Sequence, residues 1–336
     1  MIERIRMTMA AWRRMVLIAA CGCLVQSIPA RAAESAARLK VLSFNTWYDG
    51  TKVDDGFEKL AKAITESGAD VACLQESSAA TSRRMAERLG WHAVEGGRGS
   101  VQIVSRYQIA EVITGETPGS DRLLGARLRT GAANDAGLMV FNLHLDFRSY
   151  GPYAARKPGA TAESVLEDNA RSERVTQMRG ALETMRRFLE NADKCPVILS
   201  GDFNVPSHLD WTAATAAAHG GVGPVAWPES LLVEKAGFID TFRACHPDPV
   251  LTPGNSWSSI HKESEPQDRI DFIHHKGSPL GVVDCKLFAT TVETTVGEWS
   301  EGAEAARANT WPSDHSAVLA TFEWSNKPAE AGIGAR

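Results

Sequence analysis

Short apolar runs recur along the chain from residue 39 onward, each bounded by polar residues, glycine or proline. Runs of this length and composition are typical of buried β-strands. The pattern predicts strands at Leu39–Phe44, Val71–Leu74, Val101–Val104, Leu138–Leu143, Val197–Leu199, Arg269–Ile273, Val282–Ala289 and Ala317–Phe322.

Segments with apolar residues three and four positions apart lie between several of these strands and predict amphipathic helices. We expect helices at Asp54–Ser67 and Ser78–Leu89, ended by Gly68 and Gly90, and a long one at Ala162–Glu190. Helices that alternate with the early strands, followed by more closely spaced strands, indicate a mixed α/β domain rather than a regular parallel sheet.

The first 32 residues have the pattern of an export signal. Arg13-Arg14 precede an apolar run over Met15–Val25, and Ala30-Arg31-Ala32 provides a small-residue cleavage site. This order predicts a signal peptide at 1–32 and an exported, periplasmic or secreted protein. Lipoprotein processing at Cys21 is the alternative. The apolar run is about half of the roughly 20 residues needed to cross a bilayer, so we expect no stable membrane span.

The rest of the chain reads as one domain. The hydrophobic share of 43% and charged share of 23% exclude a collagen-like or disordered chain. Because repeats and low-complexity linkers are absent from the sequence, we expect a single domain over 33–325 and a flexible tail over 326–336. Two Gly- and Pro-containing segments, 147–160 and 244–267, are long for connections without secondary structure, which favours a functional role.

Charge and cysteine content narrow the classes of partner and site. Without the first 32 residues the chain holds 31 basic and 40 acidic residues, a net charge of −9. A chain this acidic repels a polyanion at long range, so nucleic acid is a disfavoured partner.

The absence of a C-x-x-C pair argues against a zinc ribbon or a thioredoxin-like site. Whether Cys245 and Cys285 form a disulfide is left open, because sequence does not supply the geometry.

Polar residues stand at the ends of the predicted strands. Any one of them is most often a turn or a helix cap. Together they are costly to fold unless they meet each other, water or a cation, and strand ends at one rim of stacked sheets let them meet. The positions are Asn45, Gln75-Glu76, Asn142-Leu143-His144, Gly201-Asp202-Phe203-Asn204, Asp271 and Ser313-Asp314-His315.

These motifs, in this order over about residues 39 to 323, resemble those of the endonuclease/exonuclease/phosphatase superfamily. The combination of Gly201-Asp202-Phe203-Asn204 with Ser313-Asp314-His315 is the most specific part. The resemblance implies a DNase I-like fold of class α/β (α+β), a four-layer sandwich of two packed mixed β-sheets flanked by helices. It also implies an enzyme that hydrolyses phosphoesters with Mg²⁺ or Mn²⁺.

The resemblance further implies a role for each site residue. Metal ligands are expected at Glu76, which is the principal one, and at Asn45 and Asp314. The other expected roles are activation of the attacking water by Asp202, hydrogen bonding to the transition state by Asn204, phosphoryl contacts by His315 and His144, and orientation of His315 by Asp271.

Departures from the family pattern bear on the substrate. Trp47 stands where DNA-repair members carry a second acidic ligand, and His144 stands where they carry tyrosine, so an abasic-site nuclease is disfavoured. Arg148 and His208 are further candidates for substrate contact. The sequence therefore favours an exported phosphoesterase acting on a small phosphodiester or phosphomonoester. The alternatives are an extracellular nuclease and, less favoured, a non-catalytic binding module of the same fold.

Overall fold

The computed structural model describes residues 38–95, 100–115, 117–131, 137–289 and 307–324. The predicted signal peptide at 1–32, with Cys21, and the predicted tail at 326–336 lie outside this described part. No helix within the described ranges combines the length and apolarity needed to cross a bilayer.

Two mixed six-stranded sheets form the centre of the domain. The first sheet has the order β11-β12-β1-β2-β4-β3, with strands Leu280–Phe288, Ala317–Trp324, Arg38–Asn45, Val71–Gln75, Val101–Ser105 and His92–Ala93. The second has the order β5-β6-β7-β8-β10-β9, with strands Gln108–Thr114, Leu123–Arg129, Leu138–His144, Val197–Asp202, Asp271–Lys276 and Ile239–Asp240.

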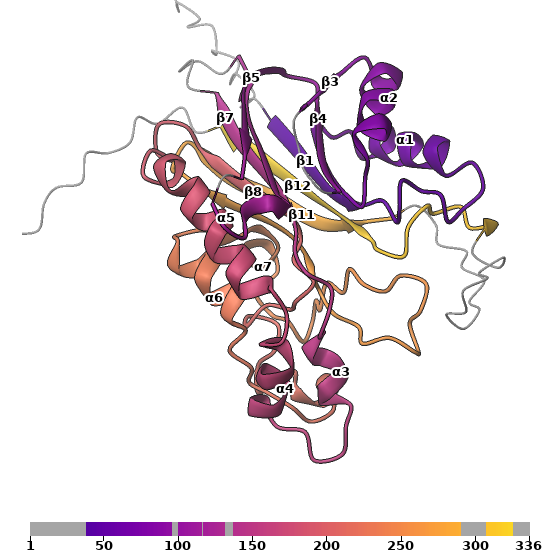
Figure 1. Cartoon of the computed structure of the whole chain (residues 1–336), viewed down its shortest axis with the longest axis vertical. Helices are drawn as coiled ribbons and strands as arrows, with labels where there is room; N and C mark the ends of the chain where they lie inside the picture. Colours follow the sequence, from indigo (N-terminus) through magenta and orange to yellow (C-terminus); the bar gives the residue numbers. More distant parts are fainter. Residues whose placement is uncertain (1–37, 96–99, 116, 132–136, 290–306, 325–336) are drawn as a thin grey trace, which may run out of the picture. The chain divides into compact units, whose positions relative to one another are not determined.

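Helices cover the outer faces of both sheets (Figure 1). The α-helices are α1 Gly56–Ser67, α2 Ala79–Leu89, α3 Gly151–Ala155, α4 Ala162–Asn169, α5 Arg174–Leu189, α6 Pro228–Lys235 and α7 Thr241–Cys245. Short 3₁₀ turns lie at Ser120–Arg122 and Ala216–His219.

Three apolar clusters hold the layers together. Val71 of the first sheet and Val140 of the second belong to the cluster between the sheets. Ile64 of α1 packs in the outer cluster of the first sheet, and Met178 of α5 packs with Phe141 in that of the second. The arrangement confirms the predicted four-layer sandwich of two packed mixed sheets flanked by helices.

The predicted helix Ala162–Glu190 is wrong in one respect, because the chain breaks it into α4 and α5. Arg174, at the start of α5, is fully buried and donates hydrogen bonds to the carbonyls of Asp146, Arg148 and Ser149. The N–H of Glu173 donates to the Asp146 carboxylate at 3.0 Å. The break thus lets a charged side chain reach backbone acceptors that an uninterrupted helix would not offer it.

The strand prediction missed the β5–β6 hairpin. β5 is an edge strand whose side chains are mostly exposed or half-buried, so no apolar run marks it. β6 contains Gly125, where an added Cβ would lie 2.4 Å from Cε1 of the Phe141 ring. This close approach requires glycine, and glycine interrupts the apolar pattern from which strands are predicted.

Strand pairing brings the strand ends to one edge of the sandwich. β1 and β2 run parallel with Asn45 beside Gln75, and β7 and β8 run parallel with His144 beside Asp202. β10 runs antiparallel to β8 and pairs Asp271 with Asp202. The carboxyl ends of four strands and the start of a fifth therefore meet.

Candidate active site

Asp202, the last residue of β8, is 1% exposed and held through both carboxylate oxygens. Its Oδ1 accepts from the N–H of Asn204 at 2.9 Å, and its Oδ2 accepts from Nδ2 of Asn45 at 3.0 Å. Burial raises the pKa of Asp202 to about 7, with a further contribution from the negative charge of Asp271. A carboxylate with that pKa is suited to take a proton from water near neutral pH.

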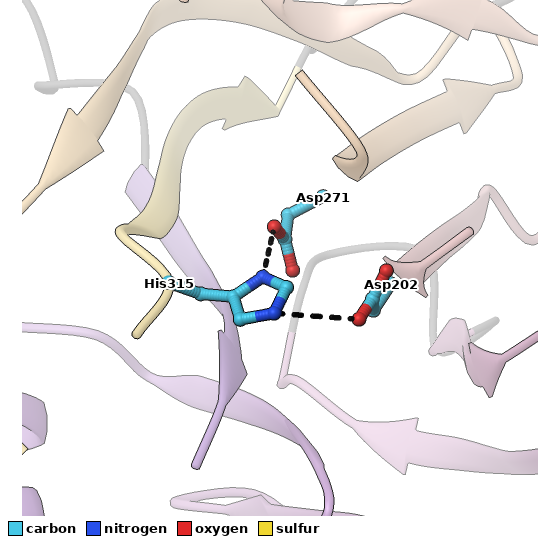
Figure 2. Close-up of side chains that lie close together, drawn as sticks. All are labelled: Asp202, Asp271 and His315. Atoms are coloured by element: carbon cyan, nitrogen blue, oxygen red, sulfur yellow. Dashed lines mark hydrogen bonds and ion pairs between the residues drawn. The ribbon is translucent and has the colours of Figure 1, made fainter. Parts of the chain in front are cut away.

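His315 lies between two carboxylates, as Figure 2 shows. Its Nδ1 is 2.8 Å from Oδ2 of Asp271, and its Nε2 is 3.8 Å from Oδ2 of Asp202. Burial by itself lowers the pKa of His315, but the charges of Asp271 and Asp202 outweigh it and raise that pKa well above its usual value. His315 is therefore a buried imidazolium whose Nδ1–H is held by Asp271, which leaves Nε2–H for another acceptor.

His144 approaches Asp202 from the end of β7. Its Nε2 lies 3.5 Å from Oδ2 of Asp202, and its Nδ1 lies 3.3 Å from Oγ of Ser100. Burial lowers the pKa of His144 to about 4, so this ring is neutral at pH 7. The site thus contains one charged and one neutral histidine, and both can donate a hydrogen bond.

Glu76 and Asp314 place two carboxylates on the other side of Asn45. Glu76 accepts from Nδ2 of Asn45 at 3.3 Å and from the N–H of Tyr48 at 3.1 Å. Burial raises the pKa of Asp314 to about 7; the charge of His315 lowers it and that of Glu76 raises it. Among the described residues, Oδ1 of Asp314 is buried without a hydrogen-bond partner. This oxygen lies 3.9 Å from Nε2 of His315, within ion-pair range but too far for a hydrogen bond. A buried acceptor without a hydrogen bond is costly unless a cation binds there.

The chemistry of these donors fits a hard divalent cation. Carboxylate and amide oxygens are the ligands that Mg²⁺ and Mn²⁺ prefer, and Glu76, Asn45 and Asp314 supply them. Asp202, Asp271 and His315 also bring potential ligand atoms within 4.8 Å of one another. Because His315 already donates to Asp271, that second group is better suited to proton chemistry than to metal binding.

A cavity of about 730 Å³ opens onto these side chains. Predicted site residues that line it are Glu76, His144, Asp202, Asn204, Asp314 and His315. Asn45 and Asp271 are buried behind this wall and contact it through hydrogen bonds. Asn204 also donates from Nδ2 to the carbonyl of Leu145 at 3.0 Å, which leaves its second amide hydrogen for a ligand.

Two predicted substrate contacts, Arg148 and His208, bind other side chains of the protein. Arg148 forms a bidentate pair with Asp146, with Nε–Oδ1 at 2.8 Å and Nη2–Oδ2 at 3.0 Å. His208 binds Ser230 through Nδ1 at 2.6 Å. Neither Arg148 nor His208 is among the residues that line the cavity.

Several residues that line the cavity were not singled out from the sequence, among them Tyr48, Arg122 and Phe147. Arg122 ends the 3₁₀ turn that leads into β6. The β5–β6 hairpin was not predicted, so nothing in the sequence indicated a role for this arginine just before β6. Tyr48 and Phe147 follow Asn45 and His144 by three residues. This closeness in sequence to two predicted site residues could have identified them.

Two of the polar residues at strand ends serve the interior instead. Gln75 donates from Nε2 to Oδ1 of Asn142 at 2.7 Å, which links the two sheets. Asn142 donates in turn to the carbonyls of Leu74 and Gln102. Both side chains are fully buried, so they satisfy polar groups between the sheets.

Within the described part of the chain the four cysteines, Cys73, Cys195, Cys245 and Cys285, are free thiols, so the structure does not join Cys245 to Cys285.

Comparison with known proteins identifies related chains. A family model described as the Endonuclease/Exonuclease/phosphatase family matches residues 42–315. An uncharacterized protein of Caenorhabditis elegans is 34% identical over 302 residues, which cover 84% of this chain and 91% of that protein.

Solved structures of similar fold include two phosphatases. The mannosyl-6-phosphatase Bt3783 of Bacteroides thetaiotaomicron matches with a TM-score of 0.54 and 20% identity, covering 85% of this chain and 100% of that one. A 3′ phosphatase, NExo, from Neisseria, bound to a product DNA hairpin, matches with a TM-score of 0.55 and 18% identity, again covering 85% and 100%. At this identity the likeness concerns the fold.

Proposed function

The chain belongs to the endonuclease/exonuclease/phosphatase family, and from this we propose that it is an exported, metal-dependent phosphoesterase acting on a small phosphodiester or phosphomonoester. One observation carries the proposal. Three kinds of group face one cavity. They are Asp202, a buried carboxylate with a raised pKa; His315, a buried imidazolium; and the carboxylate pair of Glu76 and Asp314.

Asp202 acts as the general base. It takes a proton from a water molecule, whose oxygen attacks phosphorus in line with the ester oxygen that leaves. The P–O bond to the leaving oxygen breaks as the new one forms, so no covalent enzyme intermediate arises. Hydrogen bonds from Asn204 and Asn45 hold the carboxylate in place for this step.

The remaining side chains stabilise the negative charge on the phosphoryl oxygens. His315 donates from Nε2, with its ring held by Asp271. His144 and Asn204 donate as neutral groups. Glu76, Asn45 and Asp314 would hold Mg²⁺ or Mn²⁺, which when bound polarises a phosphoryl oxygen and offsets developing charge.

A substrate panel tests this function. Bis-p-nitrophenyl phosphate, p-nitrophenyl phosphate and plasmid DNA are assayed with Mg²⁺ or Mn²⁺, after chelation, and after the metal is restored. We expect turnover of a small ester that stops on chelation and returns with metal. Turnover that is indifferent to chelator contradicts the metal assignment. Rapid, salt-sensitive nicking of DNA would favour the nuclease instead.

Export is a separate part of the proposal and rests on the pattern of residues 1–32. Expression of the full chain in a bacterium, followed by fractionation and N-terminal sequencing, tests it. We expect a mature chain that begins at Ala33 outside the cytoplasm. A lipid-modified N-terminus at Cys21 supports the lipoprotein alternative, and an uncleaved cytoplasmic chain contradicts export.

A further inference from the structure

The chain after Asn45 forms one turn of left-handed helix. Trp47, Tyr48 and Asp49 have φ of 48°, 56° and 61°, and Gly50 follows with 74°. The N–H of Gly50 donates to the carbonyl of Thr46 at 2.7 Å, which closes the turn. Three successive non-glycine residues in this region are strained, and such strain persists only where the surroundings enforce it, most often at functional sites.

The surroundings enforce this turn through the candidate metal site. The N–H of Tyr48 donates to the carboxylate of Glu76, and the N–H of Asp49 donates to the carbonyl of Glu76. The Asp49 carboxylate accepts from the N–H of Ser78 at 2.7 Å. The buried ring of Trp47 packs with Val53 and Ile260 below the turn. These contacts fix the backbone of Tyr48 and leave its side chain 58% exposed.

Tyr48 and Phe147 both line the catalytic cavity. Phe147 is 70% exposed, although it is wholly apolar. Trp257 also lines the cavity, half-buried and packed edge-on against Tyr150 with ring centroids 5.6 Å apart. Single exposed aromatic side chains are common on protein surfaces, but two on the wall of one cavity offer flat apolar faces that a ligand can cover.

The charge of this mouth indicates which part of a ligand meets these rings. Asp49, Glu76 and Asp314 are acidic, and Arg122 is the one arginine or lysine among the described residues that line the cavity. The metal site and Arg122 therefore match one phosphoryl group. Lys52, outside the cavity lining, lies over one face of the Tyr48 ring with Nζ 5.0 Å from its centroid, which leaves the other face and Phe147 for an uncharged group. The organic part of the substrate then lies against uncharged aromatic faces.

We propose that Tyr48 and Phe147 form a subsite for a planar ring in the organic part of the phosphoester. The proposal rests on the phosphoesterase function proposed above and specifies its substrate class. Offset stacking and edge contacts on Tyr48 and Phe147 would bind an aryl group or a nucleobase in preference to an alkyl chain. The left-handed turn is the device that presents Tyr48 to this ring.

Unreactive phosphonates test the subsite. Methyl-, cyclohexyl- and phenylphosphonate are titrated as competitive inhibitors of the metal-loaded protein, so that only the organic group varies. We expect phenylphosphonate to bind about 3- to 10-fold more tightly than the other two, the size of an aromatic stacking contact. Cyclohexylphosphonate that binds as tightly as phenylphosphonate would overturn the preference for a planar ring.

Variants locate the effect. Tyr48→Asn removes the ring and suits the left-handed backbone, because asparagine adopts positive φ more readily than most residues. Phe147→Leu keeps apolar bulk but loses the aromatic face. Each variant should lower the phenyl-to-methyl affinity ratio, and the double variant should bring it close to one. Leu251→Ala, which removes an apolar side chain 80% exposed and outside the cavity lining, should leave the ratio unchanged.

The outcomes separate this inference from the proposed function. If all three phosphonates bind equally while the protein turns over phosphoesters, the subsite is wrong and the function stands. If no phosphonate binds and no ester is hydrolysed, the function itself fails. Phenyl phosphate and adenosine 5′-monophosphate, each compared with ribose 5-phosphate as a substrate, distinguish an aryl group from a nucleobase as the source of the ring.

Discussion

Arg269 and His315 are both buried cations between two carboxylates, yet their surroundings differ. Arg269 donates two hydrogen bonds to Asp210 and two to Asp240, at 2.8 to 3.0 Å. Arg243 donates to Asp210 as well, at 2.6 Å. This group of two arginines and two aspartates is balanced in charge. Although burial by itself raises the pKa of Asp240, Arg269 outweighs it and lowers that pKa to about 2.

The active site holds an excess of negative charge instead. His315 and Arg122 are the cations there, against the carboxylates of Glu76, Asp202, Asp271 and Asp314. The pKa of Asp202 and that of Asp314 are each raised to about 7, and Oδ1 of Asp271 has no hydrogen-bond partner among the described residues. The comparison teaches that buried carboxylates matched by guanidinium groups stabilise the fold, while those left unmatched are available to a cation and to proton transfer.

Replacement of Asp202, the proposed general base, should have the largest effect. Asp202→Asn removes the proton acceptor but keeps the size and polarity of the side chain, so we expect kcat to fall about 10³-fold or more with little loss of stability. Steady-state kinetics and urea denaturation measure the two quantities. Asp284→Asn, an exposed carboxylate on β11, is the matched control. A loss of less than about tenfold would remove Asp202 from the proposed role.

Loss of the balancing cation should chiefly affect stability. Arg269→Met leaves Asp210 and Asp240 buried with less compensation, so we expect the free energy of unfolding to fall by about 3–5 kcal/mol. Arg307→Met, which breaks the exposed Arg307–Asp54 pair at 3.1 Å, should change it by less than about 1 kcal/mol. Equal effects of Arg269→Met and Arg307→Met in urea denaturation would refute the distinction between matched and surface charge.

Two buried carboxylates near Arg269, those of Asp240 and Asp268, should change the free energy of unfolding with pH in opposite directions. The pKa of Asp240 is lowered to about 2, so its contribution is present above pH 4 and lost as pH falls from about 4 to 2, about 2 kcal/mol in all. Burial raises the pKa of Asp268 to about 6. Tyr150 and Trp211 donate hydrogen bonds to its carboxylate. Its folded form retains a proton that the unfolded chain loses, so stability should fall by about 3 kcal/mol as pH rises from about 4 to 6.

Denaturation of single variants across this range separates the two contributions. Asp240→Asn should reduce the slope of the profile below pH 4. Asp268→Asn should reduce the slope between pH 4 and 6, where Asp202 and Asp314 also contribute. A profile in which Asp268→Asn leaves the slope between pH 4 and 6 unchanged would contradict the assignment.

Loss of Arg148, whose partner Asp146 is buried, should have the smallest effect on catalysis. The side chain of Arg148 is 65% exposed and paired with Asp146 outside the cavity lining. Arg148→Ala should therefore alter kcat/KM less than about twofold. It leaves the buried Asp146 carboxylate with the N–H donors of residues 148 and 173, so the free energy of unfolding should fall by about 1–3 kcal/mol. A loss of kcat/KM of tenfold or more would place Arg148 in contact with the substrate after all.

The sequence predicted most of the fold, and it singled out polar residues that the structure brings together, because both produce local patterns. Apolar runs marked the buried strands, and polar residues at their ends marked Asn45, Glu76, Asp202, Asp271 and His315. The sequence did not predict the β5–β6 hairpin, because an edge strand buries too few side chains to show an apolar run. Arg122 remained hidden with it.

The sequence by itself therefore determined the class of fold and the set of polar residues that meet at one edge. Only the tertiary structure decided how that set divides. It directs Gln75 and Asn142 between the sheets, pairs Arg148 with Asp146, and brings Tyr48 and Phe147 to the cavity mouth. The physical reason is that these outcomes depend on contacts between residues distant in the chain, such as Asn45 with Asp202, which no local periodicity reports.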